Sequence, residues 1–360
     1  METRVIEVDV LDDCRAVYKE AAAVLAEGGL VALPTETVYG LGADAFCTEA
    51  VANVFAVKER PSFDPLICHL PNARALRDIA DVPAELQPLV DTLAREFWPG
   101  PMTLVLPRKA CVPDIVTSGL PTVACRVPSH EVMRGVARAL GHPIAAPSAN
   151  RFGHISPTSA GAVLKELGGR IPLVLDAGAC SEGLESTILL PCLDEKGKPA
   201  VRILREGPLT REKLRGICRV LRNKPAKAPA EGGNADGDET AARPQAPGQL
   251  KSHYAPSKPL LLRNPREPFE PEPGLRYGLI TYQGDSPLAA QDCWTEVMPL
   301  SPGSGRLSEA AVRLFAVMRA MDECPDVDVI VAEELPLQGL GAAMMDRLTR
   351  ASAKRGEVLS

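Results

Sequence analysis

The segment Leu30-Val31-Ala32-Leu33-Pro34-Thr35-Glu36-Thr37-Val38-Tyr39-Gly40-Leu41-Gly42 is the most informative part of the chain. Its first four residues are apolar and end at a proline, so they predict a buried strand. Hydroxyl groups, one carboxylate and two glycines follow, and they predict a polar loop. Ligands of open α/β sheets usually bind where strands end in such loops, so we expect a binding site here.

A cationic cluster, Lys58-Glu59-Arg60-Pro61, follows a helix-like run. In an extended segment alternate side chains point to the same side, so Lys58 and Arg60 could both face one polyanion. Lysine supplies a mobile charge, and arginine supplies a planar, two-pronged donor for phosphate or carboxylate. A solvated, charged helix end explains the same residues without any ligand.

A third cluster, Pro147-Ser148-Ala149-Asn150, repeats the order of apolar run, proline and polar groups. A hydroxyl and an amide with backbone donors between them suit phosphate oxygens or a ribose. A simple turn accounts for this cluster when it is considered alone. Considered together, the three clusters predict a site for a phosphorylated, anionic ligand.

Two polar residues interrupt apolar strands. Arg126 lies near the end of the run 122–127, where an unpaired charge is costly, so it is either salt-bridged or faces an anionic ligand. His69 lies in the run 66–70, where a histidine satisfied in the core is commoner than a catalyst. The chain has no GxxxxGK[ST] motif, which excludes a P-loop protein.

The composition is that of a globular protein with an aliphatic core, because 45% of the 360 residues are hydrophobic and only 4% are aromatic. The net charge of -6 argues against binding nucleic acid by overall charge, although a local basic patch is compatible with it. The ten cysteines include no CxxC pair and form no ligand spacing with the five histidines, so we expect no zinc site and no metal-ligand residues. We expect reduced thiols in a cytoplasmic protein without a signal peptide or membrane span.

Strand-like and helix-like runs alternate over residues 1–220, which predicts an α/β domain. The expected strands are 30–33, 66–70, 103–106, 122–127, 144–146, 173–175 and 201–204, and the expected helices are 15–26, 49–57, 131–140, 159–167 and 210–220. Between Leu221 and Leu250 there is no Val, Ile, Leu, Met or aromatic residue, so we expect a flexible linker over residues 221–256. A second alternation over residues 257–360 predicts a smaller α/β domain.

Several short motifs occur in a fixed order along the chain. They are Pro34-Thr35-Glu36-Thr37-Val38-Tyr39-Gly40-Leu41, Lys58-x-Arg60, Ser148-x-Asn150, Ser156-Pro157-Thr158, Glu185-Ser186-Thr187, Ile203-Leu204-Arg205-x-Gly207 and His253-Tyr254-Ala255-Pro256. This ordered set resembles the threonylcarbamoyl-AMP synthase (YrdC-like) family in its long two-domain form. The resemblance implies a twisted, open mixed sheet with a concave cavity, followed by a small Rossmann-like α/β domain.

The resemblance also implies a reaction. Such an enzyme joins L-threonine, bicarbonate or carbon dioxide, and ATP into threonylcarbamoyl-AMP and releases pyrophosphate. A partner enzyme then transfers the threonylcarbamoyl group to an adenosine of tRNA. Because the threonine carbamate and the α-phosphate are both anions, the site needs cations, magnesium included, to screen them.

The same resemblance assigns roles to individual residues. The residues expected to bind ATP are Thr35, Lys58, Arg60, Ser148, Asn150, Arg205 and Tyr254, and the two expected to be catalytic are Lys58 and Arg60. The residues expected to bind threonine are Thr35, His69, Thr122, Arg126 and Ser186. Arg126 is expected to pair with the threonine carboxylate, and Tyr254 is expected to fold over the cavity and shield the adenylate from water.

Three departures and two rival functions accompany the resemblance: Phe152 replaces a usual Ser, Ala177 replaces a usual Gly, and the third departure is Asp64. Asp64 stands where the family usually has Asn, which adds a negative charge beside the expected phosphate cations.

A non-catalytic RNA-binding module of the same fold would need a basic groove. A carbamoyl transferase that uses related adenylate chemistry usually carries zinc-finger regions, and the absence of CxxC pairs argues against it.

Overall fold

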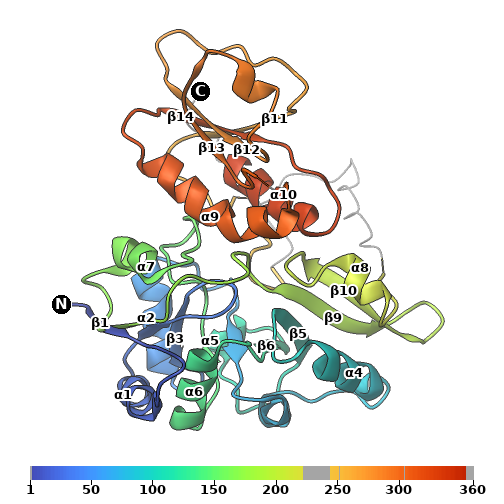
Figure 1. The fold of residues 1–360 in the computed structure, drawn as a ribbon. Coiled ribbons are helices and arrows are strands. Elements are labelled where there is room, and N and C mark those ends of the chain that lie inside the picture. The colour runs from blue at the N-terminus through green and yellow to red at the C-terminus, as the bar shows by residue number, and fades with distance from the viewer. Residues whose placement is uncertain (1, 222–243, 251, 304, 354–360) are drawn as a thin grey trace, which may run out of the picture.

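The computed structural model describes residues 2–221, 244–250, 252–303 and 305–353. Two α/β units lie one above the other, each built around its own sheet (Figure 1). The expected α/β class with a large mixed sheet and a second, smaller unit is confirmed. Among these residues, no helix is both long and apolar enough to cross a membrane.

The strands described in the first unit form one sheet in the order β1-β8-β2-β3-β7-β4-β6-β5-β9-β10. The sheet is mixed, because it contains parallel pairs such as β4 with β6 and antiparallel pairs such as β5 with β6. The strands are β1 Arg4–Glu7, β2 Val31–Leu33, β3 Gly40–Asp44, β4 Ile67–His69, β5 Met102–Pro107, β6 Thr122–Arg126, β7 Ile144–Ala145, β8 Leu173–Asp176, β9 Thr187–Leu193 and β10 Pro199–Arg205.

Helices cover both faces of this sheet, and apolar side chains fill the space between them. On one face, α1 and α6 pack on each other through residues such as Leu25 and Val136, which have no exposed surface. The helices of the first unit are α1 Arg15–Ala26, α2 Thr48–Lys58, α3 Leu76–Ile79, α4 Gln87–Phe97, α5 Asp114–Thr117, α6 Glu131–Leu140, α7 Ala160–Leu167 and α8 Arg211–Arg215. The helix expected over residues 210–220 therefore ends early, because Val220 forms a bridge to Val201 instead.

The segment Leu30–Gly42 forms a hairpin. Strand β2 pairs with β3 in antiparallel fashion, with Leu33 opposite Gly40, so the polar loop is limited to residues 34–39. The expectation that both glycines lie in the loop is wrong. A Cβ atom at Gly42 would lie 2.8 Å from Cγ2 of Ile144 on β7, so glycine permits the close approach of these strands.

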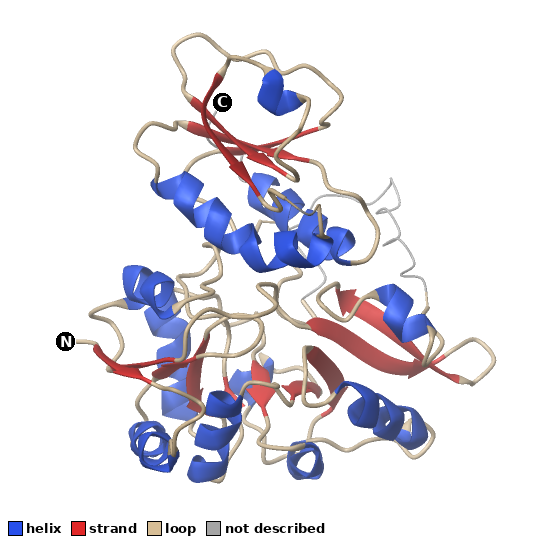
Figure 2. Cartoon of the chain, viewed as in Figure 1, coloured by secondary structure: helices blue, strands red, loops and turns tan. Residues whose placement is uncertain are grey.

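The second unit has a four-stranded parallel sheet in the order β11-β14-β12-β13. Its strands are β11 Leu260–Arg263, β12 Tyr277–Thr281, β13 Trp294–Pro299 and β14 Val329–Glu333, and its helices are α9 Leu307–Glu323 and α10 Leu340–Ser352. Helices α9 and α10 lie between this small sheet and the first unit (Figure 2). Their apolar side chains share one core with Val38, Leu184 and Tyr254, so the two units are packed together.

The expectation of a flexible linker is wrong for residues 244–250, which are packed against the first unit. Ala246 has no exposed surface, and Arg205 donates a 3.3 Å hydrogen bond to the carbonyl oxygen of Pro247. Small residues permit this packing, because the backbone can approach its neighbours closely. Residues 222–243 of the expected linker lie outside the described residues.

Candidate functional site

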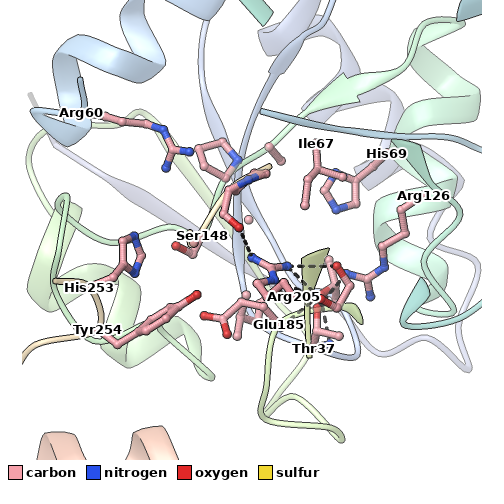
Figure 3. Close-up of a pocket in the computed structure, with 18 residues that line it drawn as sticks. Thr37, Arg60, Ile67, His69, Arg126, Ser148, Glu185, Arg205, His253 and Tyr254 are labelled. Carbon is pink, nitrogen blue, oxygen red and sulfur yellow. Dashed lines mark hydrogen bonds between the residues drawn. The ribbon is translucent and has the colours of Figure 1, made fainter. Parts of the chain in front are cut away.

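A pocket lies where the β2–β3 loop, the ends of β4 and β6, the loop after β7, residues 247–248 and residues 253–254 meet. Figure 3 shows Arg60 at one end of it, Arg126 and His69 at the other, and Arg205 between them. The sequence-predicted site residues that line it are Thr35, Arg60, His69, Arg126, Ser148, Ser186, Arg205 and Tyr254. The pocket thus gathers residues from all three polar clusters.

Arg126 is buried at the end of β6. The sequence left open whether it is salt-bridged or faces the ligand site, and both descriptions apply. Its guanidinium lies 2.7 Å from Oε1 of Glu36 and donates a 2.9 Å hydrogen bond to Oγ1 of Thr37. Burial alone would raise the pKa of Glu36, but Arg126 and the backbone N–H of Ser129 hold it below its usual value. Arg126 is therefore ion-paired structurally and also lines the pocket.

His69 on β4 is a neutral neighbour of Arg126. Burial, reinforced by the Arg126 charge, lowers the pKa of His69 to about 3, so the imidazole carries no charge at neutral pH. Its Nδ1 atom is buried and has no hydrogen-bond partner in the described structure. A buried, unpaired ring nitrogen that lines a pocket is available to a polar ligand.

Arg60 reaches the opposite end of the pocket from the residues that follow α2. It lies 2.9 Å from Oδ2 of the buried Asp64 and donates to the carbonyl oxygens of Asp64 and Pro65 at 3.1 and 3.0 Å. The expected extended alternation of Lys58 and Arg60 is wrong. Helix α2 continues through Lys58, and Glu59 then takes a left-handed conformation with φ of 56°.

Lys58 and Asn150 support the pocket from behind and are not among the residues that line it. The Lys58 ammonium donates to the carbonyl oxygens of Ser148 and Asn150. The Asn150 amide donates to the carbonyl oxygens of Arg151 and His154 at 2.7 and 2.9 Å. Burial and the nearby Arg60 charge lower the pKa of Lys58 well below its usual value. These contacts fix the loop that presents Ser148 to the pocket.

Arg205 ends β10 and binds the loop that carries Ser186. It donates to the carbonyl oxygen of Ser186 at 3.1 and 3.0 Å and to its hydroxyl at 3.1 Å. Thr122, by contrast, begins β6 opposite Pro107 and is not brought to the pocket. Arg126 stands at the other end of the same strand, about 13 Å away at the usual rise per residue.

Residues 247–248 and 253–254 close one side of the pocket. Tyr254 is 1% exposed, has φ of 62°, and lies with its ring centroid 4.2 Å from that of His253. Its hydroxyl has no hydrogen-bond partner in the described structure and points toward the middle of the pocket in Figure 3. A Cβ atom at Gly248 would lie 2.6 Å from this hydroxyl, so only glycine leaves room for it.

Several residues that line the pocket had no role expected from the sequence. They are Thr37, Gly40, Glu185, Gly248 and His253. Thr37, Gly40, Glu185 and His253 belong to the ordered motifs, and Gly248 belongs to the pair Pro247-Gly248, which also resembles the long two-domain form. In the described part of the chain, no group of three or more His, Cys, Asp or Glu side chains is arranged to hold a metal ion.

Comparisons with known proteins cover nearly the whole chain. The family model described as "Telomere recombination" matches residues 23–207, and the one described as "Threonylcarbamoyl-AMP synthase, C-terminal domain" matches residues 209–353. A threonylcarbamoyl-AMP synthase of Pyrococcus abyssi is 38% identical over 93% of this chain and 94% of its own length. One of Bacillus subtilis is 36% identical over 99% of each chain. The crystal structure of P. abyssi Sua5 complexed with L-threonine superposes with a TM-score of 0.78 at 35% identity, covering 98% of both chains.

Proposed function

Because the chain belongs to the threonylcarbamoyl-AMP synthase family, we propose that it joins L-threonine, bicarbonate or carbon dioxide, and ATP into threonylcarbamoyl-AMP and pyrophosphate. The observation that carries the proposal is a single pocket with buried arginines at its two ends and in its middle. One anionic substrate is accommodated at each end, and their reacting groups meet between the ends. This makes the enzyme a nucleotidyltransferase that serves tRNA modification.

The reaction has two bond-forming steps. The neutral amine of threonine first attacks carbon dioxide, which forms an N–C bond and, after loss of a proton, a carbamate anion. A carbamate oxygen then attacks the α-phosphorus of ATP, and the bond from that phosphorus to the bridging oxygen breaks as pyrophosphate leaves. Both partners are anions, so catalysis consists mainly of positioning and charge neutralisation.

We assign threonine to the end that contains Arg126. The guanidinium would pair with the threonine carboxylate, and the neutral His69 beside it would accept or donate a hydrogen bond. Thr35 and Ser186 supply hydroxyl groups at the same end. The similar P. abyssi Sua5 was crystallised in complex with L-threonine, which supports an amino-acid site in this fold.

We assign the nucleotide to the end that contains Arg60 and to Arg205. Arg60 would hold the triphosphate and stabilise charge on the departing pyrophosphate. Ser148 would contact the nucleotide directly, while Lys58 and Asn150 hold its loop in place. A magnesium ion would enter with ATP, bound to the phosphate oxygens. The buried carboxylates near the pocket, Glu36, Asp64 and Glu185, are paired with arginines, so they do not form a ligand set for the ion.

The product implies a further enzyme. Threonylcarbamoyl-AMP is a reactive mixed anhydride, so a partner that transfers the threonylcarbamoyl group to tRNA must consume it. All ten cysteines are free thiols, which suits the reducing environment of the cytoplasm. The rival RNA-binding function is less well supported, because Arg60, Arg126 and Arg205 are buried around a pocket and do not line an open surface groove.

Pyrophosphate release tests the proposed reaction. We expect release from Mg–ATP only when L-threonine and bicarbonate are present together, because the carbamate is the attacking group. Mass spectrometry with labelled bicarbonate should then detect labelled threonylcarbamoyl-AMP. Release with ATP alone, or equal release with glycine in place of threonine, would contradict the proposal.

A further inference from the structure

Arg347 on α10 is a buried residue of the second unit that reaches the wall of the pocket. It has no exposed surface, and its Nε donates a 2.9 Å hydrogen bond to Oε2 of Glu185, which lines the pocket. Its guanidinium carbon lies 5.3 Å from the centroid of the Tyr254 ring. One side chain of the second unit therefore contacts two residues of the site.

Glu185 is an unusual residue for a pocket that accepts anions. One carboxylate oxygen of Glu185, Oε1, accepts a 2.5 Å hydrogen bond from the hydroxyl of Ser156. The other, Oε2, is ion-paired with Arg347, so Arg347 supplies the positive charge that balances Glu185 in the described structure. The next residue, Ser186, accepts three hydrogen bonds from Arg205. A carboxylate here without its cation would repel a nucleotide held by Arg205.

The loop that carries Glu185 is also packed tightly against the second unit. A Cβ atom at Gly183 would lie 2.4 Å from Cα of Val312 on α9, and Gly183 has φ of 68°. Leu184 lies in the core of the second unit and has no exposed surface. The position of residues 183–186 is thus set by α9 and α10 together.

We propose that Arg347 is a positioning residue through which the second unit completes the middle of the pocket, beside Arg205. It neutralises and orients Glu185, and it supports the ring of Tyr254 by a cation–π contact. The second unit therefore contributes to nucleotide affinity without any side chain that contacts the substrate. This inference rests on the proposed function, because it takes the ligand of the pocket to be ATP.

Arg319 on α9 provides a matched control. It also links the two units, since it lies 3.0 Å from Glu166 and donates a 2.7 Å hydrogen bond to the carbonyl oxygen of Ile155. Neither Glu166 nor Ile155 lines the pocket. Arg319→Met therefore removes an arginine that holds the units together but leaves the charge balance of the pocket unchanged.

The test is titration calorimetry with ATP alone, which measures affinity without turnover. We expect Arg347→Met to raise the Kd about tenfold or more, because one partner of a buried pair is left charged. Arg319→Met should stay within about twofold, because its contacts lie outside the pocket. The double variant Arg347→Met/Glu185→Gln should recover most of the lost affinity, because Glu185 no longer carries a charge and Asp346, the other carboxylate paired with Arg347, keeps its ion pair with Arg350.

The outcomes separate this inference from the proposed function. If the wild-type protein does not bind ATP, the proposed function fails, and the inference fails with it. If it binds ATP but Arg347→Met and Arg319→Met change the Kd equally, or the double variant shows no recovery, only the inference is overturned. Arg347→Lys keeps the positive charge, and it replaces Arg347→Met in the test if the methionine variant does not fold. Its Kd should rise less than about threefold, and a tenfold rise would contradict charge neutralisation.

Discussion

At the scale of single residues, buried arginine–carboxylate pairs dominate the site. Glu36 pairs with Arg126, and Asp64 pairs with Arg60. Removal of one member of such a pair costs about 3–5 kcal/mol, because the other remains charged in the interior. Each arginine therefore has a structural role in addition to the ligand-binding role proposed for it, and mutational tests must separate the two.

The pair of Arg60 and Asp64 allows such a separation. Arg60→Gln alone would leave Asp64 uncompensated, whereas Arg60→Gln/Asp64→Asn replaces the ion pair by two amides. We expect the double variant to fold and to lose about tenfold to hundredfold in kcat/KM, because a hydrogen bond to a charged group is worth about 1.5–3 kcal/mol. Steady-state pyrophosphate release measures this, with Asp64→Asn as the matched control. Wild-type turnover in the double variant would refute the phosphate role of Arg60.

At the scale of elements, local patterns predicted the type of most segments, and two segments that the structure contains were not expected. The helices expected over residues 15–26 and 131–140 have those bounds in the structure. Strand β9 was not among the expected strands; it contains Pro191, a residue that is depleted in the interior of sheets. Helix α4 was not expected although Leu89, Val90 and Leu93 form an apolar face that would have revealed it.

The β2–β3 hairpin gives a prediction at this scale. We expect Gly42→Ala to lower the free energy of unfolding by about 1–3 kcal/mol, because the new methyl group meets Ile144 and the carbonyl oxygen of Val31. Gly161→Ala in α7 is the control, since the atom nearest to its new methyl group would be 4.0 Å away. That change should instead stabilise by about 0.5–1 kcal/mol, because alanine favours helix. Urea unfolding measures both, and equal effects would contradict the close packing at Gly42.

At the scale of the whole molecule, the second unit supports the pocket of the first unit by packing against residues that line it. Val38 of the polar loop and Tyr254 lie in the core formed by α9 and α10. Arg350 of α10 donates to the carbonyl oxygen of Leu250, which anchors the same segment. The second unit is therefore part of the site as well as part of the fold.

Burial of histidines across the molecule makes stability depend on pH. His69 has a pKa of about 3, and burial lowers the pKa of His253 well below its usual value of 6.5. As pH falls below that usual value, the unfolded chain binds protons at these positions and the folded chain does not, so stability decreases toward about pH 4. Each histidine contributes about 1.4 kcal/mol per pH unit in this window. Glu182 and Glu333 act in the opposite direction, because burial raises the pKa of each.

A glutamine variant isolates the contribution of one histidine. In urea unfolding at pH 7, 6 and 5, wild type should lose more stability than His69→Gln does on acidification, because glutamine cannot titrate. The difference between the two should grow by about 1.4 kcal/mol between pH 6 and pH 5 at most. A difference that does not change with pH would show that His69 is protonated in the folded protein.

The amino-acid sequence alone determined the α/β alternation and the order of the polar clusters, and it predicted a phosphorylated, anionic ligand. These follow from hydrophobic periodicity and residue chemistry, which act over a few neighbouring residues. Only the tertiary structure decided that Lys58 supports a loop behind the pocket, that Thr122 lies away from the pocket, and that Arg347 joins its wall. Glu185 and Arg347 are 162 residues apart in the chain. Their contact exists because two sheets and their helices pack together, and no local pattern encodes that packing.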